Sequence, residues 1–447
     1  MSRWTRLRES FWFLPALLCA LAVVLAEALI FVDRRIDERT LGPITVVINR
    51  VGEAGSRDLL GAIAGSTLTV AATTFSITIA VLATASSTYG PRLVRNFMTD
   101  RANQFVLGAF VATFLYALLV LRSIRVLGND TDEVFVPHLA VNVAVLFGML
   151  TIGVLVFFIH HISESIQIWT LAGKTRSELN AAVDRLYPGQ LGRAPAEVEN
   201  AAGRGDVPER LDADGTRVLA HRTGYVQGID EERLLTTATS HDLVVSLLVR
   251  PGSHAIDGTA IAVLWPPDRV GHEASSAVID CVTVGQARSP DQDVEFAVLV
   301  LEEMAVRALS PGTNDPYTAV NALDDLAAGL ARLAGRSSPS PYRYDDNGQL
   351  RVMARRVVLT DLLDGLFDAM RVYAVDHPRV LRRTLELAEQ VGAASLQPAV
   401  LARLSAHVAR VIEAFERSAP QTCDLVELRR QADDVQHSLS SLNEAGR

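Results

Sequence analysis

Lysine is almost absent from this 447-residue chain: Lys174 is the only one, and arginine supplies the rest of its 42 lysine and arginine residues. Any mechanism that needs a second lysine, such as a Schiff base in the C-terminal domain, is therefore excluded, and residues 217–290 contain no lysine that could carry biotin or lipoate. Cysteine is also scarce. Cys19, Cys281 and Cys423 form no CxxC pair and no Cys/His cluster, so neither a disulfide framework nor a structural zinc site is expected.

Signals for nucleic acid and for catalysis are missing too. The net charge is −9 and no Lys/Arg-rich run occurs, which argues against a nucleic-acid partner. We find no Walker loop, dinucleotide fingerprint, GxSxG motif or His-Glu zinc helix. We therefore expect no enzyme activity, no catalytic residues, no metal and no cofactor. The scattered histidines are interpreted as surface or strand-end residues: His221, His241, His254 and His272.

Long apolar runs fill the N-terminal third of the chain. Residues 11–160 are mostly apolar, whereas residues 174–447 carry most of the charge. About 20 apolar residues are needed to cross a hydrocarbon layer ~30 Å thick. The runs predict a transmembrane domain over residues 1–168, with helices at about 11–32, 59–85, 105–122 and 136–160.

The first apolar run has two interpretations. Arg3, Arg6 and Arg8 precede it and Ala26-Glu27-Ala28 resembles a cleavage site, as in a signal peptide. The run continues to Val32, however, which favours an uncleaved membrane anchor.

Arginines in short loops predict the orientation. The N-terminal arginines and the group Arg92, Arg95 and Arg101 fit the cytoplasmic side, and the acidic loop around Asp130 fits the outside. The first loop, with five arginines, argues the other way. Four spans with the N-terminus inside predict a multi-pass protein of the bacterial plasma (inner) membrane with its C-terminal domain in the cytoplasm.

The second apolar run carries hydroxyl side chains at helical spacing. One stripe holds Ser66, Thr69, Thr73 and Ser76, and a second holds Thr67, Thr74 and Thr78. Small hydroxyl residues allow close packing of membrane helices. Alternatively, such residues line a pathway and replace part of an ion's hydration shell. Both interpretations remain open for the first stripe.

The remaining residues predict a soluble α+β region. Residues 169–216 are expected to form a helical connector and a linker rich in Gly, Pro and acids. Residues 217–290 predict a small β-rich module, whose strand, Pro-Gly turn and strand resemble a barrel-sandwich pattern. Residues 291–447 predict a mainly helical cytoplasmic domain, a helical bundle with helices at 294–309, 317–333, 352–374, 379–417 and 424–443, and an exposed loop at 335–349.

A polar break, Ser310 to Pro316, separates two of these helices. Asp315 suits the N-cap and Pro316 the first turn of the following helix, which favours a capped connector. A helix N-terminus can also hold an anion or a partner's polar group. The residues of that alternative loop site are Arg307, Gly312, Thr313, Asn314 and Asp315.

Four stretches carry a resemblance to a known family. They read FSITIAVLATASSTYGPRLVRNFMTDR (75–101), GYVQGIDEERLL (224–235), VRPGSH (249–254) and RALSPGTNDPYTA (307–319). In these stretches the chain resembles the bacterial predicted-membrane-protein family called domain of unknown function 2254. The resemblance implies the membrane topology and implies no activity.

Two functions follow as hypotheses. The first is an oligomeric channel- or transporter-like protein, with the hydroxyl stripe along its pathway and a cytoplasmic domain for assembly or gating. The second is a membrane-anchored scaffold or sensor whose soluble domain binds a ligand or partner. Expected partners are the lipid bilayer, further copies of the chain and an unidentified small ion or ligand.

Overall fold

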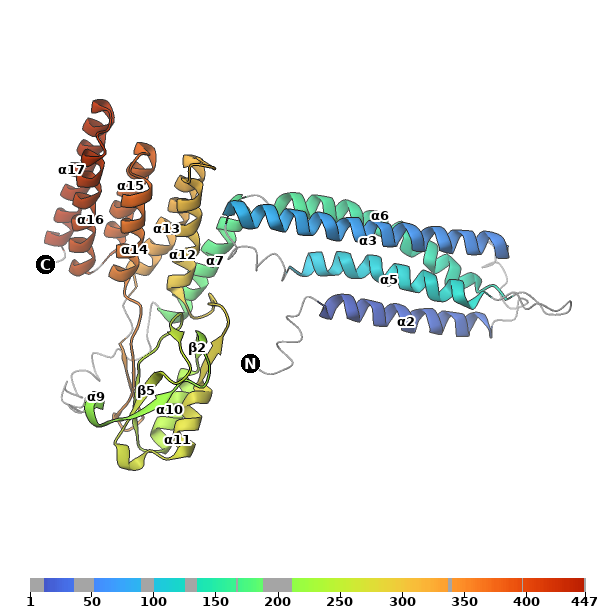
Figure 1. Cartoon of the computed structure of the whole chain (residues 1–447), viewed down its shortest axis with the longest axis horizontal. Coiled ribbons are helices and arrows are strands. Elements are labelled where there is room, and N and C mark those ends of the chain that lie inside the picture. Colours follow the sequence, from blue (N-terminus) through green and yellow to red (C-terminus); the bar gives the residue numbers. More distant parts are fainter. Residues whose placement is uncertain are drawn as a thin grey trace. The chain divides into compact units, whose positions relative to one another are not determined.

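The computed structural model in Figure 1 describes residues 12–35, 52–89, 100–124, 135–165, 168–187, 211–336, 340–395 and 397–445. The chain divides into two compact units, Met1–Leu171 and Ala172–Arg447. Most of the expected first loop, part of the motif over 75–101 and the linker residues 188–210 lie outside the described residues.

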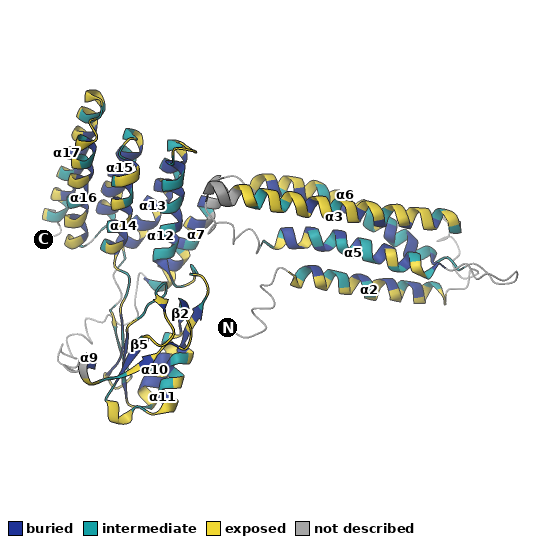
Figure 2. Ribbon diagram, viewed as in Figure 1, coloured by how far each residue is buried: buried dark blue, intermediate teal, exposed yellow. Residues whose placement is uncertain are grey.

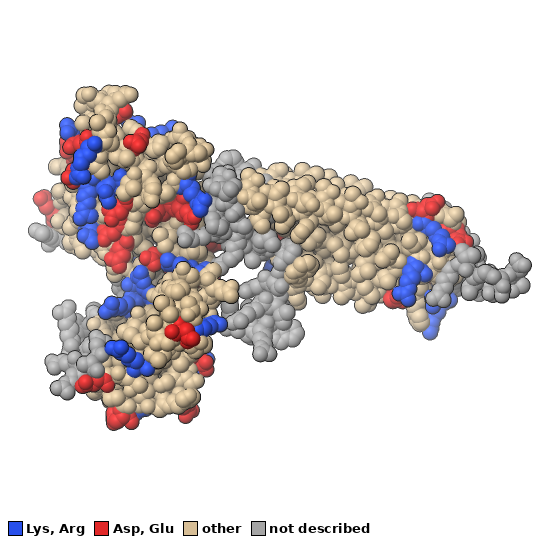
Figure 3. Space-filling view, in the orientation of Figure 1, with Lys and Arg blue, Asp and Glu red and all other residues tan. Residues whose placement is uncertain are grey.

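The first unit contains the four expected membrane helices, which confirms the predicted fold class. They are α2 (Phe13–Asp33), α3 (Glu53–Tyr89), α5 (Arg101–Ser123) and α6 (His138–Ser165), and each is long and apolar enough to span a bilayer. Helix α3 begins earlier than expected because the polar residues 53–58 add turns before its apolar run. In Figure 3 this unit shows a broad uncharged surface, with charged side chains gathered at one end.

Helix α5 lies at the centre of this bundle. About 44% of its apolar stretch is buried, against 17–22% for the other three helices. The buried Tyr116 of α5 donates its hydroxyl to the carbonyl oxygen of Ala140 on α6 (3.0 Å) and packs edge-on against Phe147. Large outward faces of α3 and α6 therefore remain uncovered by the chain's own described helices (Figure 2).

An aspartate stabilises each end of the bundle. At one end the Asp33 carboxylate accepts the backbone N–H groups of Leu139 (3.2 Å) and Ala140 (3.0 Å), so α2 caps the N-terminus of α6. At the other end Asp100 caps α5 through the Ala102 N–H and contacts His161 Nε2 of α6 at 2.8 Å. These contacts fix the lengthwise register of the helices.

The second unit contains two sheets. The larger has the order β1-β5-β3-β8-β7, antiparallel except for the parallel pair β3–β8, and the smaller is antiparallel with the order β4-β2-β6. The strands are β1 (Thr216–Leu219), β2 (Gly224–Ile229), β3 (Val244–Leu247), β4 (His254–Ala255), β5 (Ala260–Trp265), β6 (Val282–Gly285), β7 (Tyr342–Tyr344) and β8 (Leu350–Ala354).

Helices complete this unit. Helices α10 (Glu231–Ser240) and α11 (His272–Cys281) share one apolar core with strands of both sheets, which differs from the expected barrel-sandwich pattern. The other helices are α7 (Ile168–Leu186), α9 (Leu211–Asp214), α12 (Val294–Ala308), α13 (Pro316–Ala334), α14 (Leu359–Tyr373), α15 (Pro378–Ala394), α16 (Pro398–Arg417) and α17 (Thr422–Ala445). Helices α12 to α17 form the expected helical bundle, and the short α9 lies beside β5 (Figure 1).

Three local expectations were wrong. The region 335–349 contains strand β7, and residues 352–354, expected to be helical, belong to strand β8. The expected helix 379–417 is two helices, because Pro398 has no N–H to donate and instead begins α16.

Candidate functional site

The hydroxyl stripe of α3 lies on its outward face. Ser66, Thr69, Thr73 and Ser76 are all exposed, whereas Thr67 and Thr74 of the second stripe are buried against the other membrane helices. The second stripe is thus helix packing within the chain. The first stripe faces lipid, water or another molecule.

Each of three stripe hydroxyls donates to its own helix. Thr69 donates to the Gly65 carbonyl, Thr73 to the Thr69 carbonyl and Ser76 to the Ala72 carbonyl, all at 2.9 Å. A hydroxyl has one donor and two acceptor lone pairs. The stripe therefore presents oxygen acceptors to whatever lies on this side of α3.

A row of small residues overlaps the stripe and is absent from the expectations above. Gly61, Gly65, Ala72 and Ala80 are exposed on α3 at spacings that, with Thr69 and Ser76, place them on one side of the helix. The sequence did contain the signal, a Gly-x-x-x-Gly at 61–65, which is typical of membrane helices in close contact.

Ser66 also borders a groove on the surface of the membrane bundle. The groove has a volume of about 360 Å³ and lies between α3, α5 and α6. Its lining is apolar apart from Ser66, Thr67 and Thr151. The groove extends the outward face of α3 toward α6.

In the second expected site, the loop before α13, the polar groups bond to other groups of the same chain. Asp315 caps α13 by accepting the Thr318 N–H at 3.1 Å, and the N–H groups of Thr313, Asn314 and Asp315 donate to carbonyls of the preceding turn. Arg307 pairs with Glu303 on its own helix at 3.0 Å. Gly312, Thr313 and Asn314 are exposed. These contacts favour the capped connector.

Strand pairing in the soluble unit creates a site that the sequence did not predict. Strands β3 and β8 run parallel, with Leu247 opposite Ala354. Arg250 follows the first strand and Arg355 and Arg356 follow the second, so these arginines emerge at the same sheet edge. They line a small cavity of about 30 Å³ together with Tyr187, Glu231, Gln292 and apolar side chains.

Two polar contacts define the cavity wall. Arg356 Nη2 donates to Glu231 Oε2 at 2.6 Å, which joins the end of β8 to the first turn of α10. The Tyr187 hydroxyl donates to the Val357 carbonyl at 2.7 Å. Burial raises the pKa of Tyr187 to about 12, although the positive charges of Arg356 and Arg250 act to lower it.

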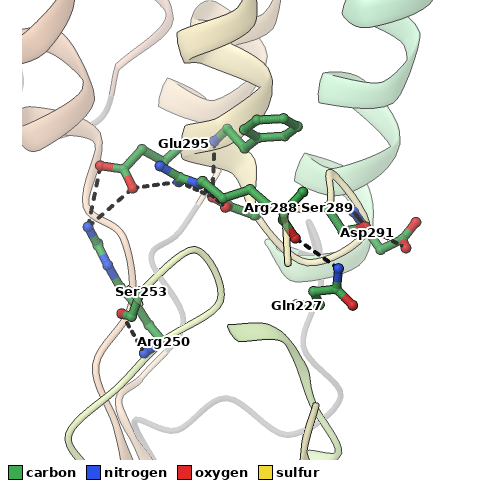
Figure 4. Close-up of polar contacts among 10 residues, drawn as sticks. Gln227, Arg250, Ser253, Arg288, Ser289, Asp291 and Glu295 are labelled. Atoms are coloured by element: carbon green, nitrogen blue, oxygen red, sulfur yellow. Dashed lines mark hydrogen bonds and ion pairs between the residues drawn. The ribbon is translucent and has the colours of Figure 1, made fainter. Parts of the chain in front are cut away.

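Arg288 anchors the neighbouring side of this site (Figure 4). Its guanidinium binds both oxygens of the buried Asp293 at 2.6 and 2.7 Å and Glu295 at 2.8 Å. Arg250 reaches the same Glu295 only at 3.4 to 3.5 Å. Gly252, with φ of +91°, lies so close to Arg288 and Asp293 that a side chain there would overlap both.

The family follows from comparison with known proteins. The family model described as a predicted membrane protein (DUF2254) matches residues 8–390. The chain belongs to the DUF2254 family. Both the outward face of α3 and the arginine-lined cavity lie inside the DUF2254 match, whereas α16 and α17 lie beyond it.

Similar proteins come from mycobacteria. The uncharacterized proteins Rv1290c of Mycobacterium tuberculosis and Mb1321c of Mycobacterium bovis are each 29% identical over 374 residues, which cover 83% of this chain and 70% of the relative. No solved structure matches the chain. The resemblance inferred from the four sequence stretches is confirmed.

Proposed function

We propose that this DUF2254 protein is the subunit of an oligomeric channel- or transporter-like membrane protein. Ser66, Thr69, Thr73 and Ser76 line a pathway shared by several copies. The observation that supports the proposal is the outward exposure of this hydroxyl stripe on a helix whose other side is packed against the bundle.

The chemistry of the stripe favours water or a cation over lipid. The hydroxyl groups of Thr69, Thr73 and Ser76 each donate a hydrogen bond to a backbone carbonyl, and their oxygen lone pairs stay free to accept one. Hydrocarbon offers these oxygens no donor, whereas water and cations bind them. In a water-filled pathway these oxygens would accept hydrogen bonds or bind cations.

The small residues beside the stripe support an oligomer. Gly61 and Gly65 have open space where a side chain would lie, so a helix of a second copy can approach their backbone closely. In this arrangement Gly61 and Gly65, at the edge of the stripe, contact the neighbouring copy, and the hydroxyls beside them face the pathway. We further propose that the soluble unit lies in the cytoplasm of a bacterial plasma membrane, where it assembles or gates the oligomer.

Ion flux into proteoliposomes tests the pathway. We expect purified full-length protein to increase potassium or sodium flux over empty liposomes. Thr73→Leu should reduce this flux several-fold, because it removes an acceptor and adds bulk to the pathway wall. Phe75→Leu is the matched control, since Phe75 is exposed on a different side of the same helix.

Two results would contradict the pathway. One is proteoliposome flux equal to that of empty liposomes for both cations. The other is an equal loss of flux in Thr73→Leu and Phe75→Leu, which would point to general damage of α3. Gly65→Leu tests the oligomer separately: it should shift the native mass in detergent toward the monomer.

The second candidate function is a membrane-anchored sensor. The arginine-lined cavity of the soluble unit favours it, because three arginines and one glutamate line a small cavity whose charge is unbalanced. In this alternative the membrane helices anchor the chain and carry the signal of ligand binding without conducting ions.

A further inference from the structure

The arginines around the cavity are incompletely paired. The Nε atom of Arg356 is buried and has no acceptor among the described residues. Arg355 is exposed and makes no ion pair within the described part of the soluble unit. Arg250 is held only weakly, at 3.4 to 3.5 Å from Glu295, whose near partner is Arg288.

Incompletely paired guanidinium groups at one place favour an anion. Glu231 is the one acid in the cavity lining, and it already accepts from Arg356 at 2.6 Å and lies 3.7 Å from Arg343. Burial and then the nearby Arg356 lower the pKa of Arg343. A buried N–H donor without an acceptor, such as the Nε of Arg356, is unfavourable, and an added oxyanion would remove that cost.

The volume limits the kind of anion. About 30 Å³ admits one or two groups the size of a water molecule. Terminal oxygens of a tetrahedral anion fit this space, while the body of a larger ligand would remain outside. The planar fork of a guanidinium matches such oxygens in pairs.

We propose that this cavity binds a tetrahedral oxyanion, the terminal group of a phosphate monoester, between Arg250, Arg355 and Arg356. The parallel strands β3 and β8 bring the three arginines together. This inference gives the sensor alternative its ligand class and is independent of ion conduction, so phosphate binding and ion flux can fail separately.

Isothermal titration calorimetry of the full-length protein in detergent tests the proposal with inorganic phosphate. We expect saturable binding to the wild type. Arg355→Gln and Arg356→Gln should each weaken it by about tenfold or more, the effect of losing one charge-assisted hydrogen bond. Arg410→Gln is the matched control, because it removes one positive charge from an exposed position on α16, outside the cavity.

A second arm identifies the source of the phosphate group. Native mass spectrometry compares adducts of phosphatidic acid and phosphatidylcholine on the same proteins. Adducts of phosphatidic acid that depend on Arg355 would assign the site to a lipid headgroup. Phosphate binding without such adducts would assign it to a soluble phosphate ester.

The variants differ in their structural risk. Arg356→Gln breaks the bond to Glu231, so its melting temperature must be compared with that of the wild type. Arg355→Gln leaves every described ion pair intact. It remains a valid test of the site if Arg356→Gln unfolds. The proposal is overturned if neither probe binds the wild type, or if Arg355→Gln weakens binding no more than the control Arg410→Gln does.

Discussion

Aspartates at helix N-termini recur through both units. Asp33, Asp100, Asp293 and Asp315 each accept backbone N–H groups at the start of a helix. The carboxylate satisfies donors that lack an intrahelical partner and complements the positive end of the helix dipole. One residue type therefore performs the same local task in a membrane bundle and in a soluble unit.

Asp315 provides a residue-scale prediction. Asp315→Ala should lower the free energy of unfolding of the soluble unit by about 1 kcal/mol at neutral pH, because α13 loses its N-cap. Thermal unfolding in detergent, followed by circular dichroism, measures the change. Asp315→Asn should retain most of the stability, and exposed Asp346→Ala is the control for loss of charge.

The same residue sets a pH dependence. Hydrogen bonding from Thr318 lowers the pKa of Asp315 in the folded chain. Its contribution is therefore complete above the unfolded pKa of about 4 and is lost as the pH falls through the lower folded value. The difference between wild type and Asp315→Ala should shrink in acid, and a difference that grows there would contradict the cap.

At the scale of elements, two glycines make a matched pair. Gly365 on α14 is exposed with open space around it, so Gly365→Ala should stabilise the chain by about 0.5–1 kcal/mol through helix propensity. Gly329 on α13 faces the buried Leu179 of α7, and an added Cβ would overlap that side chain. Gly329→Ala should therefore lose about 1 kcal/mol or more from overpacking.

The comparison needs three melting curves under the same conditions: those of the wild type, Gly365→Ala and Gly329→Ala. Melting temperatures that move in opposite directions would support close packing of α7 on α13. A higher melting temperature for both variants would mean that the Leu179 side chain moves aside without a loss of stability.

Apolar periodicity was sufficient to predict most elements. The four membrane helices and the helix pair α12 and α13 lie within six residues of their expected positions. Strand β8 was missed because the apolar residues Val352, Met353 and Ala354 read as the start of the apolar pattern of α14. Periodicity measures local amphipathicity and carries no information about a partner strand about 100 residues away.

The two candidate sites also differ in whether their residues come from one segment or from distant segments of the chain. The hydroxyl stripe could be predicted because Ser66, Thr69 and Thr73 lie on one short segment with one period. In the arginine-lined cavity, the parallel pairing of β3 and β8 brings Arg250 and Arg356 together, and Tyr187 joins them from the end of α7. The sequence contains each of these residues, but their proximity arises only in the folded chain and could not be predicted from the sequence.

At the scale of the whole molecule, the distribution of arginines predicts the membrane orientation, with the soluble unit inside the cell. The three cysteines permit a direct test in the native chain. Cys423 is exposed near the start of α17, whereas Cys281 is buried and Cys19 lies in membrane helix α2. A membrane-impermeant reagent in water should therefore react with Cys423 alone.

We expect an impermeant maleimide to label the protein in inverted membrane vesicles of a bacterial host and to leave it unlabelled in intact spheroplasts. Cys423→Ser should abolish the labelling of vesicles, because the buried Cys281 and the membrane-embedded Cys19 do not meet the reagent. Lysed spheroplasts provide the control for reagent activity. Labelling of intact spheroplasts to the same extent as vesicles would place the soluble unit outside and would remove the proposed cytoplasmic role in gating, because no cytoplasmic signal could then reach the arginine-lined cavity.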